Sequence, residues 1–227
     1  MNKPPLAILI SASSIKSGES DILADLFDIG LERLHLRKPE SSPLKVAKLL
    51  DSIPQNHHKK IVIHRFPELL NDFSLGGYHH HGRESLIKNK ENISSEGTIS
   101  RSLHNLCELK DMSEPLDYCF FGPVYESISK KGYIPKISLP ELGACLHTLK
   151  KAKTKKPLVY ALGGVRRRKI PELFNLGFDG VTLLGSIWGK KDPVAAFEKY
   201  KYVERSSWAK KEKEKGLLLR LLEKKES

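Results

Sequence analysis

The chain has 227 residues, of which 39% are hydrophobic and 29% are charged, and its formal net charge is +12. This length suits one domain with a substantial core, and the composition excludes a wholly disordered chain. No apolar run approaches the roughly 18 residues of a membrane span, and no helix-turn-helix, zinc-finger or aromatic RNA-binding motif accompanies the charge, so we expect neither a membrane nor a nucleic acid as a partner.

Short apolar runs rich in β-branched and aromatic residues recur along the chain, with helical patterns between them. This alternation is typical of parallel βα units. The predicted strands are 6–10, 33–36, 61–64, 77–80, 98–102, 118–121, 158–162 and 180–184. Eight is the number that a barrel needs, so the predicted fold is an α/β (β/α)₈ TIM barrel. A doubly wound sheet is the alternative, because periodicity does not show closure.

Start and stop signals mark the helices between these strands. Ser20 and Asp21 are predicted to cap a helix that ends at Gly30, and the eighth helix is predicted to run from Asp192 with Pro193 at its first position. Further helices are predicted over 43–50, 139–149 and 171–176. The fourth unit is the weakest, since only 84–88 separate its strand from the polar loop 89–97.

The C-terminal segment is predicted to be a basic amphipathic helix outside the barrel. We divide the chain into a barrel domain, 1–204, and a tail, 205–227. From Lys201 to Ser227 there are nine Lys or Arg and five Glu, which is typical of a solvated helix face. We expect it to pack on the barrel or on a second subunit, which makes a homodimer one prediction.

The cysteines indicate the compartment. Cys107, Cys119 and Cys145 are odd in number and form no CxxC pair, so neither a disulfide framework nor a cysteine zinc site is expected. Nothing at the N-terminus resembles an export signal. We therefore expect a cytoplasmic protein.

Polar residues at the carboxyl ends of barrel strands and in the following loops form the active sites of such barrels. Here those positions carry many histidines, basic residues and serines. The candidates are His35, Arg37, Lys38, His64, Arg65, His79, His80, His81, Arg101, Ser102, His104, Ser127, Ser129, Lys130 and Lys131.

The loops after the last two strands indicate a phosphate site. Gly163 and Gly164 follow strand seven, and Gly185, Ser186 and Ile187 follow strand eight. Glycines let backbone approach a ligand, and N–H groups at the start of a short helix can hold a phosphate. Because these two loops are the usual phosphate site of such barrels, we predict that a small phosphorylated ligand binds there.

Several segments together resemble thiamine phosphate synthase and its relative, the TenI-type thiazole tautomerase. The resemblance covers about 6–200 in consistent order and leaves the tail outside. It is carried by His35-Leu36-Arg37, by 118–124 (YCFFGPV), by Ser127-Ile128-Ser129-Lys130 and by Gly163-Gly164-Val165. It implies a (β/α)₈ barrel that holds thiazole phosphate through the backbone around Gly163, Gly164, Ser186 and Ile187.

In the synthase, a pyrimidine methyl diphosphate loses diphosphate and the thiazole nitrogen attacks the resulting cation. The resemblance places Arg37 and Ser102 at diphosphate-binding positions and Lys130 at the lysine of the loop after strand six. We therefore name Arg37 and Lys130, with His104, as candidate catalytic residues. The expected substrate-binding residues are His35, His64, Ser102, Ser127, Ser129, Gly163, Gly164, Ser186 and Ile187.

Other positions depart from the synthase. His35 replaces a glutamine, Pro39 breaks the following Glu-x-Lys pattern, and His64-Arg65 stands where the synthase has Asn-Asp with the Asp on magnesium. Glu84 appears in place of the second magnesium carboxylate. Mg²⁺ prefers hard oxygen ligands, and a cation at a ligand position adds repulsion. The synthase interpretation implies Mg²⁺, which these departures disfavour.

Two alternatives to the synthase stay open. The tautomerase transfers protons without a metal, and 101–104 (RSLH) resembles the segment that supplies its histidine, so His104 is a candidate proton shuttle. The other interpretation of His104 is a structural residue at the start of a helix. The second alternative is a barrel that binds thiamine or thiazole phosphate without catalysis.

The histidines raise the question of zinc. His35, His64 and one residue of His79, His80 and His81 end neighbouring strands, where they could bind Zn²⁺. Alternate side chains of a strand point to opposite faces, so the three consecutive histidines cannot all line the barrel. We prefer a polar lining or anion contacts over a zinc site.

Overall fold

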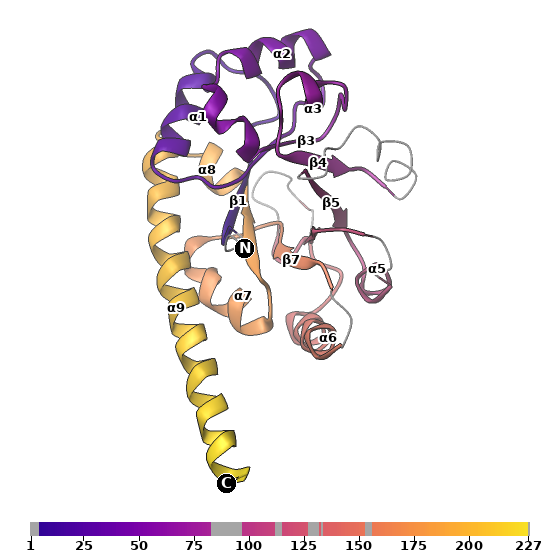
Figure 1. The fold of residues 1–227 in the computed structure, drawn as a ribbon, viewed down its shortest axis with the longest axis vertical. Helices are drawn as coiled ribbons and strands as arrows, with labels where there is room; N and C mark the ends of the chain where they lie inside the picture. The colour runs from indigo at the N-terminus through magenta and orange to yellow at the C-terminus, as the bar shows by residue number, and fades with distance from the viewer. Residues whose placement is uncertain are drawn as a thin grey trace.

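The structure is a computed structural model that describes residues 5–82, 97–111, 115–126, 132, 134–152 and 156–226. Eight parallel strands form a closed barrel in the order β1 to β8 (Figure 1). The strands are β1 Ala7–Ile10, β2 Leu34–Leu36, β3 Ile61–Ile63, β4 Gly77–His80, β5 Thr98–Leu103, β6 Tyr118–Phe121, β7 Leu158–Ala161 and β8 Gly180–Leu183. Closure comes from β1, which pairs with both β2 and β8. The predicted (β/α)₈ barrel is therefore confirmed, and the doubly wound sheet was wrong.

The strands alternate between two layers of the core. Ala7 and Leu9 of β1 belong to the layer between barrel and helices, whereas Ile8 and Ile10 point into the barrel with Tyr118 and other large side chains. The runs therefore read as continuously apolar, because both faces of a parallel strand are buried. The predicted strands match the observed ones to within one residue at each end.

Helices surround the barrel and connect successive strands (Figure 1). They are α1 Glu19–Asp28, α2 Pro43–Asp51, α3 Leu69–Asp72, α5 Leu106–Lys110, α6 Leu139–Lys151, α7 Ile170–Leu176, α8 Gly185–Trp188 and α9 Pro193–Glu226, with 3₁₀ turns η1 Gln55–Lys60 and η3 Arg167–Lys169. Serine caps begin α2 and α6, where the Ser42 and Ser138 hydroxyls accept from the backbone N–H groups of Lys45 and Glu141. The predicted helix 84–88 lies outside the described residues.

The predicted start of the first helix was wrong. The N-cap of α1 is Gly18, in the left-handed conformation and without a side-chain cap, so Ser20 and Asp21 lie inside the helix. Glu19 takes the first helical position because its carboxylate accepts from the Lys16 N–H at 3.1 Å and pairs with Lys38. The ion pair joins residues that lie far apart in the chain, so local start signals do not include it.

Helix α9 joins the predicted eighth barrel helix and the predicted tail without a break. The Asp192 side chain accepts from the Ala195 N–H, which confirms the predicted start. Phe197 and Tyr200 are buried, and α9 contacts α1, α7 and α8 before it extends beyond the barrel (Figure 1). Among the described residues, no helix is both long enough and apolar enough to cross a membrane.

Candidate active site at the barrel mouth

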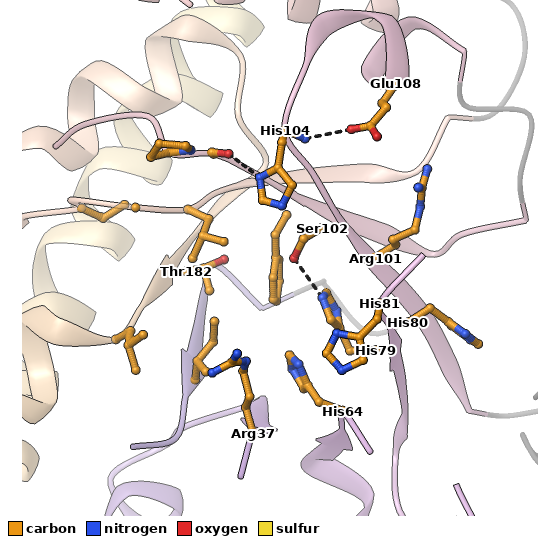
Figure 2. Close-up of a pocket in the computed structure, with 18 of the residues that line it drawn as sticks. Arg37, His64, His79, His80, His81, Arg101, Ser102, His104, Glu108 and Thr182 are labelled. Carbon is orange, nitrogen blue, oxygen red and sulfur yellow. Dashed lines mark hydrogen bonds between the residues drawn. The ribbon is translucent and has the colours of Figure 1, made fainter. Parts of the chain in front are cut away.

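A cavity of about 940 Å³ opens at the carboxyl ends of the strands. Figure 2 shows Arg37 and His64 on one side of it and His104 on the other. The predicted site residues that line it are Arg37, His64, Ser102, His104, Gly163, Gly164 and Ser186. His35 and Ile187 lie beneath the surface and are fully buried. Ser127, Ser129, Lys130 and Glu84 lie outside the described residues, so their roles stay predictions.

Three histidines from neighbouring strands meet at the base of this cavity. The Nδ1 atom of His35 lies 2.9 Å from Nε2 of His64, and the rings of His64 and His79 stack with centroids 4.3 Å apart. His79 hydrogen-bonds through its two ring nitrogens to Ser100 and Ser102, at 2.9 and 3.0 Å. The three imidazoles thus pack together inside the barrel, with a hydrogen bond between His35 and His64 and ring contacts to His79.

These imidazoles are held neutral. Burial, as the largest cause, lowers the pKa of His35 and of His64 well below the usual 6.5 and that of His79 to about 3. The neighbouring histidines lower each pKa further, because two adjacent imidazolium ions repel each other. Anion binding through positive charge on these rings, which the sequence suggested, is therefore disfavoured.

The side chains of the three consecutive histidines point in different directions, as the alternation of side chains along a strand predicts. His79 turns into the barrel, whereas His80 packs against Tyr78 with ring centroids 4.8 Å apart. His81 is exposed at the mouth. In Figure 2, His80 and Arg101 extend away from the centre of the cavity.

The Ser11 hydroxyl contacts both the backbone N–H and the carbonyl oxygen of Arg37. The backbone N–H of Arg37 donates to the Ser11 hydroxyl at 2.9 Å, and that hydroxyl lies 3.2 Å from the Arg37 carbonyl oxygen. The next residue, Lys38, is buried and donates to the carbonyl oxygens of Ala12 and Ser14 and to Glu19. Lys38, which does not fit the Glu-x-Lys pattern of the synthase, is thus a structural residue. It holds the end of β2 against the loop after β1.

His104 has a defined tautomer. Its Nδ1 atom lies 2.8 Å from the carbonyl oxygen of Gly122, which can only accept, so Nδ1 carries a proton and the lone pair of the neutral ring is on Nε2. Figure 2 shows the ring directed into the cavity. The backbone N–H of His104 donates to the Glu108 carboxylate at 2.9 Å. This arrangement presents a proton acceptor to a bound ligand.

Gly163 and Gly164 pack against the protein's own loop. Both have positive φ, 92° and 65°. A Cβ on Gly163 would lie 2.8 Å from Pro123, and one on Gly164 would lie 2.3 Å from the Glu126 carbonyl oxygen. The glycines are therefore required for the close contact between the loops after β6 and β7, whatever they do for a ligand.

The start of α8 borders two cavities. Gly185 and Ser186 line the main cavity and also a second one of about 820 Å³. The second cavity carries five basic residues, which are Arg166, Arg167, Arg168, Lys190 and Lys199. The Ile187 N–H donates to the Leu184 carbonyl oxygen, so of the predicted pair Ser186 is the better phosphate ligand.

The sequence analysis did not identify Thr182 as a site residue. It lies in β8, is 2% exposed and lines the cavity (Figure 2). Its hydroxyl has no hydrogen-bond partner among the described residues. A polar residue between Val181 and Leu183 in an otherwise apolar strand was the available signal. Tyr118 and Ser100, which contact the histidines, were also missed.

Fold and site define a (β/α)₈ barrel with a polar ligand cavity at the carboxyl ends of its strands, the usual position of an active site in this fold. The family model described as thiamine monophosphate synthase matches residues 7–187. The chain therefore belongs to the thiamine monophosphate synthase family, as the resemblance predicted.

Individual relatives agree with this assignment. A thiamine-phosphate synthase of Bacteroides thetaiotaomicron is 28% identical over 140 residues, and the matched segment covers 61% of this chain and 66%, just under two thirds, of that relative. The crystal structure of a thiamine phosphate pyrophosphorylase from the same organism has a TM-score of 0.69 at 29% identity, covering 87% of this chain and 96% of that one. A pyrophosphorylase from Pyrococcus furiosus shares the fold, with a TM-score of 0.72 at 17% identity, covering 91% and 98% of the two chains.

Proposed function

We propose that this protein joins a pyrimidine methyl diphosphate to thiazole phosphate, with release of diphosphate, in the manner of a thiamine phosphate synthase. The observation that carries the proposal is the arrangement of the cavity, with Arg37 at the end of β2 and Ser186 at the start of α8. A substrate pair with one phosphate and one diphosphate needs two anion sites, and these residues supply candidates for both.

The chemistry of bond formation sets what the residues must do. The carbon–oxygen bond to diphosphate breaks, diphosphate takes the electron pair, and the thiazole nitrogen donates its pair to the pyrimidine methylene carbon. Arg37 would bind the departing diphosphate, because a guanidinium matches phosphate oxygens through paired hydrogen bonds. Phe120 and Ile10, which line the cavity, would keep water from the cation.

Magnesium does not fit the described residues at the expected position. Where the family has an aspartate after strand three, this chain has Arg65, which is exposed, donates to the Pro39 carbonyl oxygen and lies over the Phe66 ring. A guanidinium cannot bind a cation and repels it instead. The other candidate, Glu84, lies outside the described residues. We therefore propose no step through magnesium.

The test is product formation from the two substrates by the purified chain, with and without Mg²⁺. We expect thiamine phosphate and diphosphate to appear in equal amounts, with a rate that changes little when Mg²⁺ is removed. Arg65→Asp is the informative variant, because it restores the family's carboxylate and should make the rate respond to Mg²⁺. If neither protein forms thiamine phosphate under any condition, the synthase proposal is wrong.

A specific observation favours a second candidate, the metal-free tautomerase. The Gly122 carbonyl oxygen holds Nδ1 of His104, so Nε2 is the nitrogen of the neutral ring that could take a proton from a thiazole carbon. If the protein is a tautomerase, Nε2 accepts that proton and helps to deliver it to another carbon.

The His104→Ala variant separates the two candidates. General acid–base catalysis contributes about 10²- to 10⁴-fold, so a tautomerase should lose that much of its kcat. A synthase should retain most of its rate, since no proton transfer limits bond formation. Turnover of each substrate set by both proteins checks this, and full tautomerase activity in the variant would exclude the proton-shuttle role. A protein that binds both phosphates tightly but turns over neither set would be a non-catalytic binder.

A further inference from the structure

Three buried imidazoles from β2, β3 and β4 direct ligand atoms toward one another at the base of the cavity. One ring nitrogen from each of His35, His64 and His79 can be chosen so that all lie within 4.8 Å of one another. We propose that these three histidines form a binding site for a divalent transition-metal ion of the zinc class, with an open coordination position toward the cavity. This proposal does not depend on the proposed function.

The donor set decides the class of metal. Neutral imidazole suits Zn²⁺, Co²⁺ and Cu²⁺, whereas Mg²⁺ requires hard oxygen ligands. Three protein ligands with a fourth position left open are the usual arrangement of a reactive zinc site.

The distances require a small adjustment. Two nitrogens on a tetrahedral zinc ion lie about 3.3 Å apart, since each Zn–N bond is about 2.0 to 2.1 Å. The pair His35 Nδ1 and His64 Nε2, at 2.9 Å, shares one proton, and a metal ion would take its place. The widest separation, within 4.8 Å, has to close by about 1.5 Å. His64 and His79 border the open cavity, which leaves room for this movement.

In His35 and His79, the remaining ring nitrogen already has the kind of partner that metal ligands need. The Tyr118 hydroxyl lies 2.7 Å from His35 Nε2, and the Ser100 hydroxyl lies 2.9 Å from His79 Nδ1. Such outer contacts accept the ring N–H, fix the tautomer and orient the lone pair of the other nitrogen. They leave His35 Nδ1 and His79 Nε2 as the ligand atoms.

The open position faces the ligand. His79 Nε2 now lies 3.0 Å from the Ser102 hydroxyl, and Ser102 lines the cavity. A bound ion would displace that hydroxyl and complete its coordination with a water or with an oxygen of an anion in the cavity. Arg37 on the cavity wall would favour the anion.

The experiment uses the full chain after treatment with a chelator, titrated separately with Zn²⁺ and Mg²⁺ by calorimetry and with Co²⁺ in the visible spectrum. We expect one Zn²⁺ per chain, no saturable binding of Mg²⁺ and the strong visible absorption of four-coordinate Co²⁺. His64→Ala should weaken Zn²⁺ binding by more than about 100-fold. His147→Gln is the matched control, because His147 is exposed on α6 and bonds only its own helix among the described residues.

The Tyr118→Phe variant separates a loss of zinc binding from a loss of folding. It keeps the ring and removes only the hydroxyl on His35, so Zn²⁺ affinity should fall by about 10- to 100-fold with the far-ultraviolet circular dichroism unchanged. Absence of saturable Zn²⁺ binding to the unaltered chain would overturn the proposal. Equal affinities of the unaltered, His64→Ala and Tyr118→Phe proteins would also overturn it, since the zinc would then bind elsewhere.

Discussion

At the scale of single residues, most of the chemistry depends on which face of a strand a side chain occupies. His79 points into the barrel and hydrogen-bonds to Ser100 and Ser102, whereas His80 and Arg101 extend away from the centre of the cavity (Figure 2). The sequence placed His79, His80, Arg101 and Ser102 at strand ends correctly. It could not show which of them meet, because the pairing of β4 with β5 is set by long-range register.

The buried ion pair between Lys38 and Glu19 links the chain after β2 to the start of α1 beside the cavity mouth. Both side chains are about 1% exposed, and burial lowers the pKa of Lys38 despite the contact with Glu19. Removing one partner leaves a buried charge unpaired, so Lys38→Met should reduce the free energy of unfolding by about 3 to 5 kcal/mol. Urea unfolding of both proteins measures this loss.

The control for that substitution is Lys150→Met. Lys150 pairs with Asp179 at 2.7 Å, but its side chain is 41% exposed. Exposed pairs contribute about 0 to 1 kcal/mol, so this variant should unfold close to the unaltered protein. Similar small losses from both substitutions would mean that the buried pair does not hold the end of β2.

At the scale of elements, local sequence patterns predicted the strands and several helices. They missed the features that depend on tertiary contacts. The strands were found because both of their faces are apolar, and α2 and α6 because each begins with a serine cap and a proline. The start of α1 was missed because Lys38 is nineteen positions away from Glu19. The loop after β7 was recognised by its glycines, but the reason for them is the neighbouring loop after β6.

Gly164→Ala tests that contact between loops. The left-handed conformation alone costs a non-glycine residue about 1 to 2 kcal/mol, and the collision with the Glu126 carbonyl oxygen should add about 1 to 3 kcal/mol. Gly18→Ala is the matched control, since Gly18 has φ of 70° and nothing within 4 Å of an added Cβ. Thermal unfolding should show the larger loss for Gly164→Ala, and equal losses would mean that the loops tolerate the added carbon.

At the scale of the whole molecule, closure of the barrel brings distant residues to one cavity. Arg37 and Ser186 are separated by most of the chain, yet both line the mouth because β1 pairs with β2 and β8. The count of eight strands predicted this arrangement, and membership of the thiamine monophosphate synthase family supports it. Counting strands could not predict the floor of the cavity, where His35 and Tyr118 meet from different strands.

The most direct test of the account is a titration of thiazole phosphate and of diphosphate, each against the unaltered protein, Arg37→Ala and Ser186→Asp. Arg37→Ala should weaken diphosphate binding by about 10- to 100-fold, because a charge-assisted hydrogen bond contributes about 1.5 to 3 kcal/mol, and should leave thiazole phosphate unchanged. Ser186→Asp should do the reverse, since a carboxylate beside the phosphate repels it by several kcal/mol. Two variants that weaken both ligands equally, or neither, would contradict a cavity with two separate anion sites.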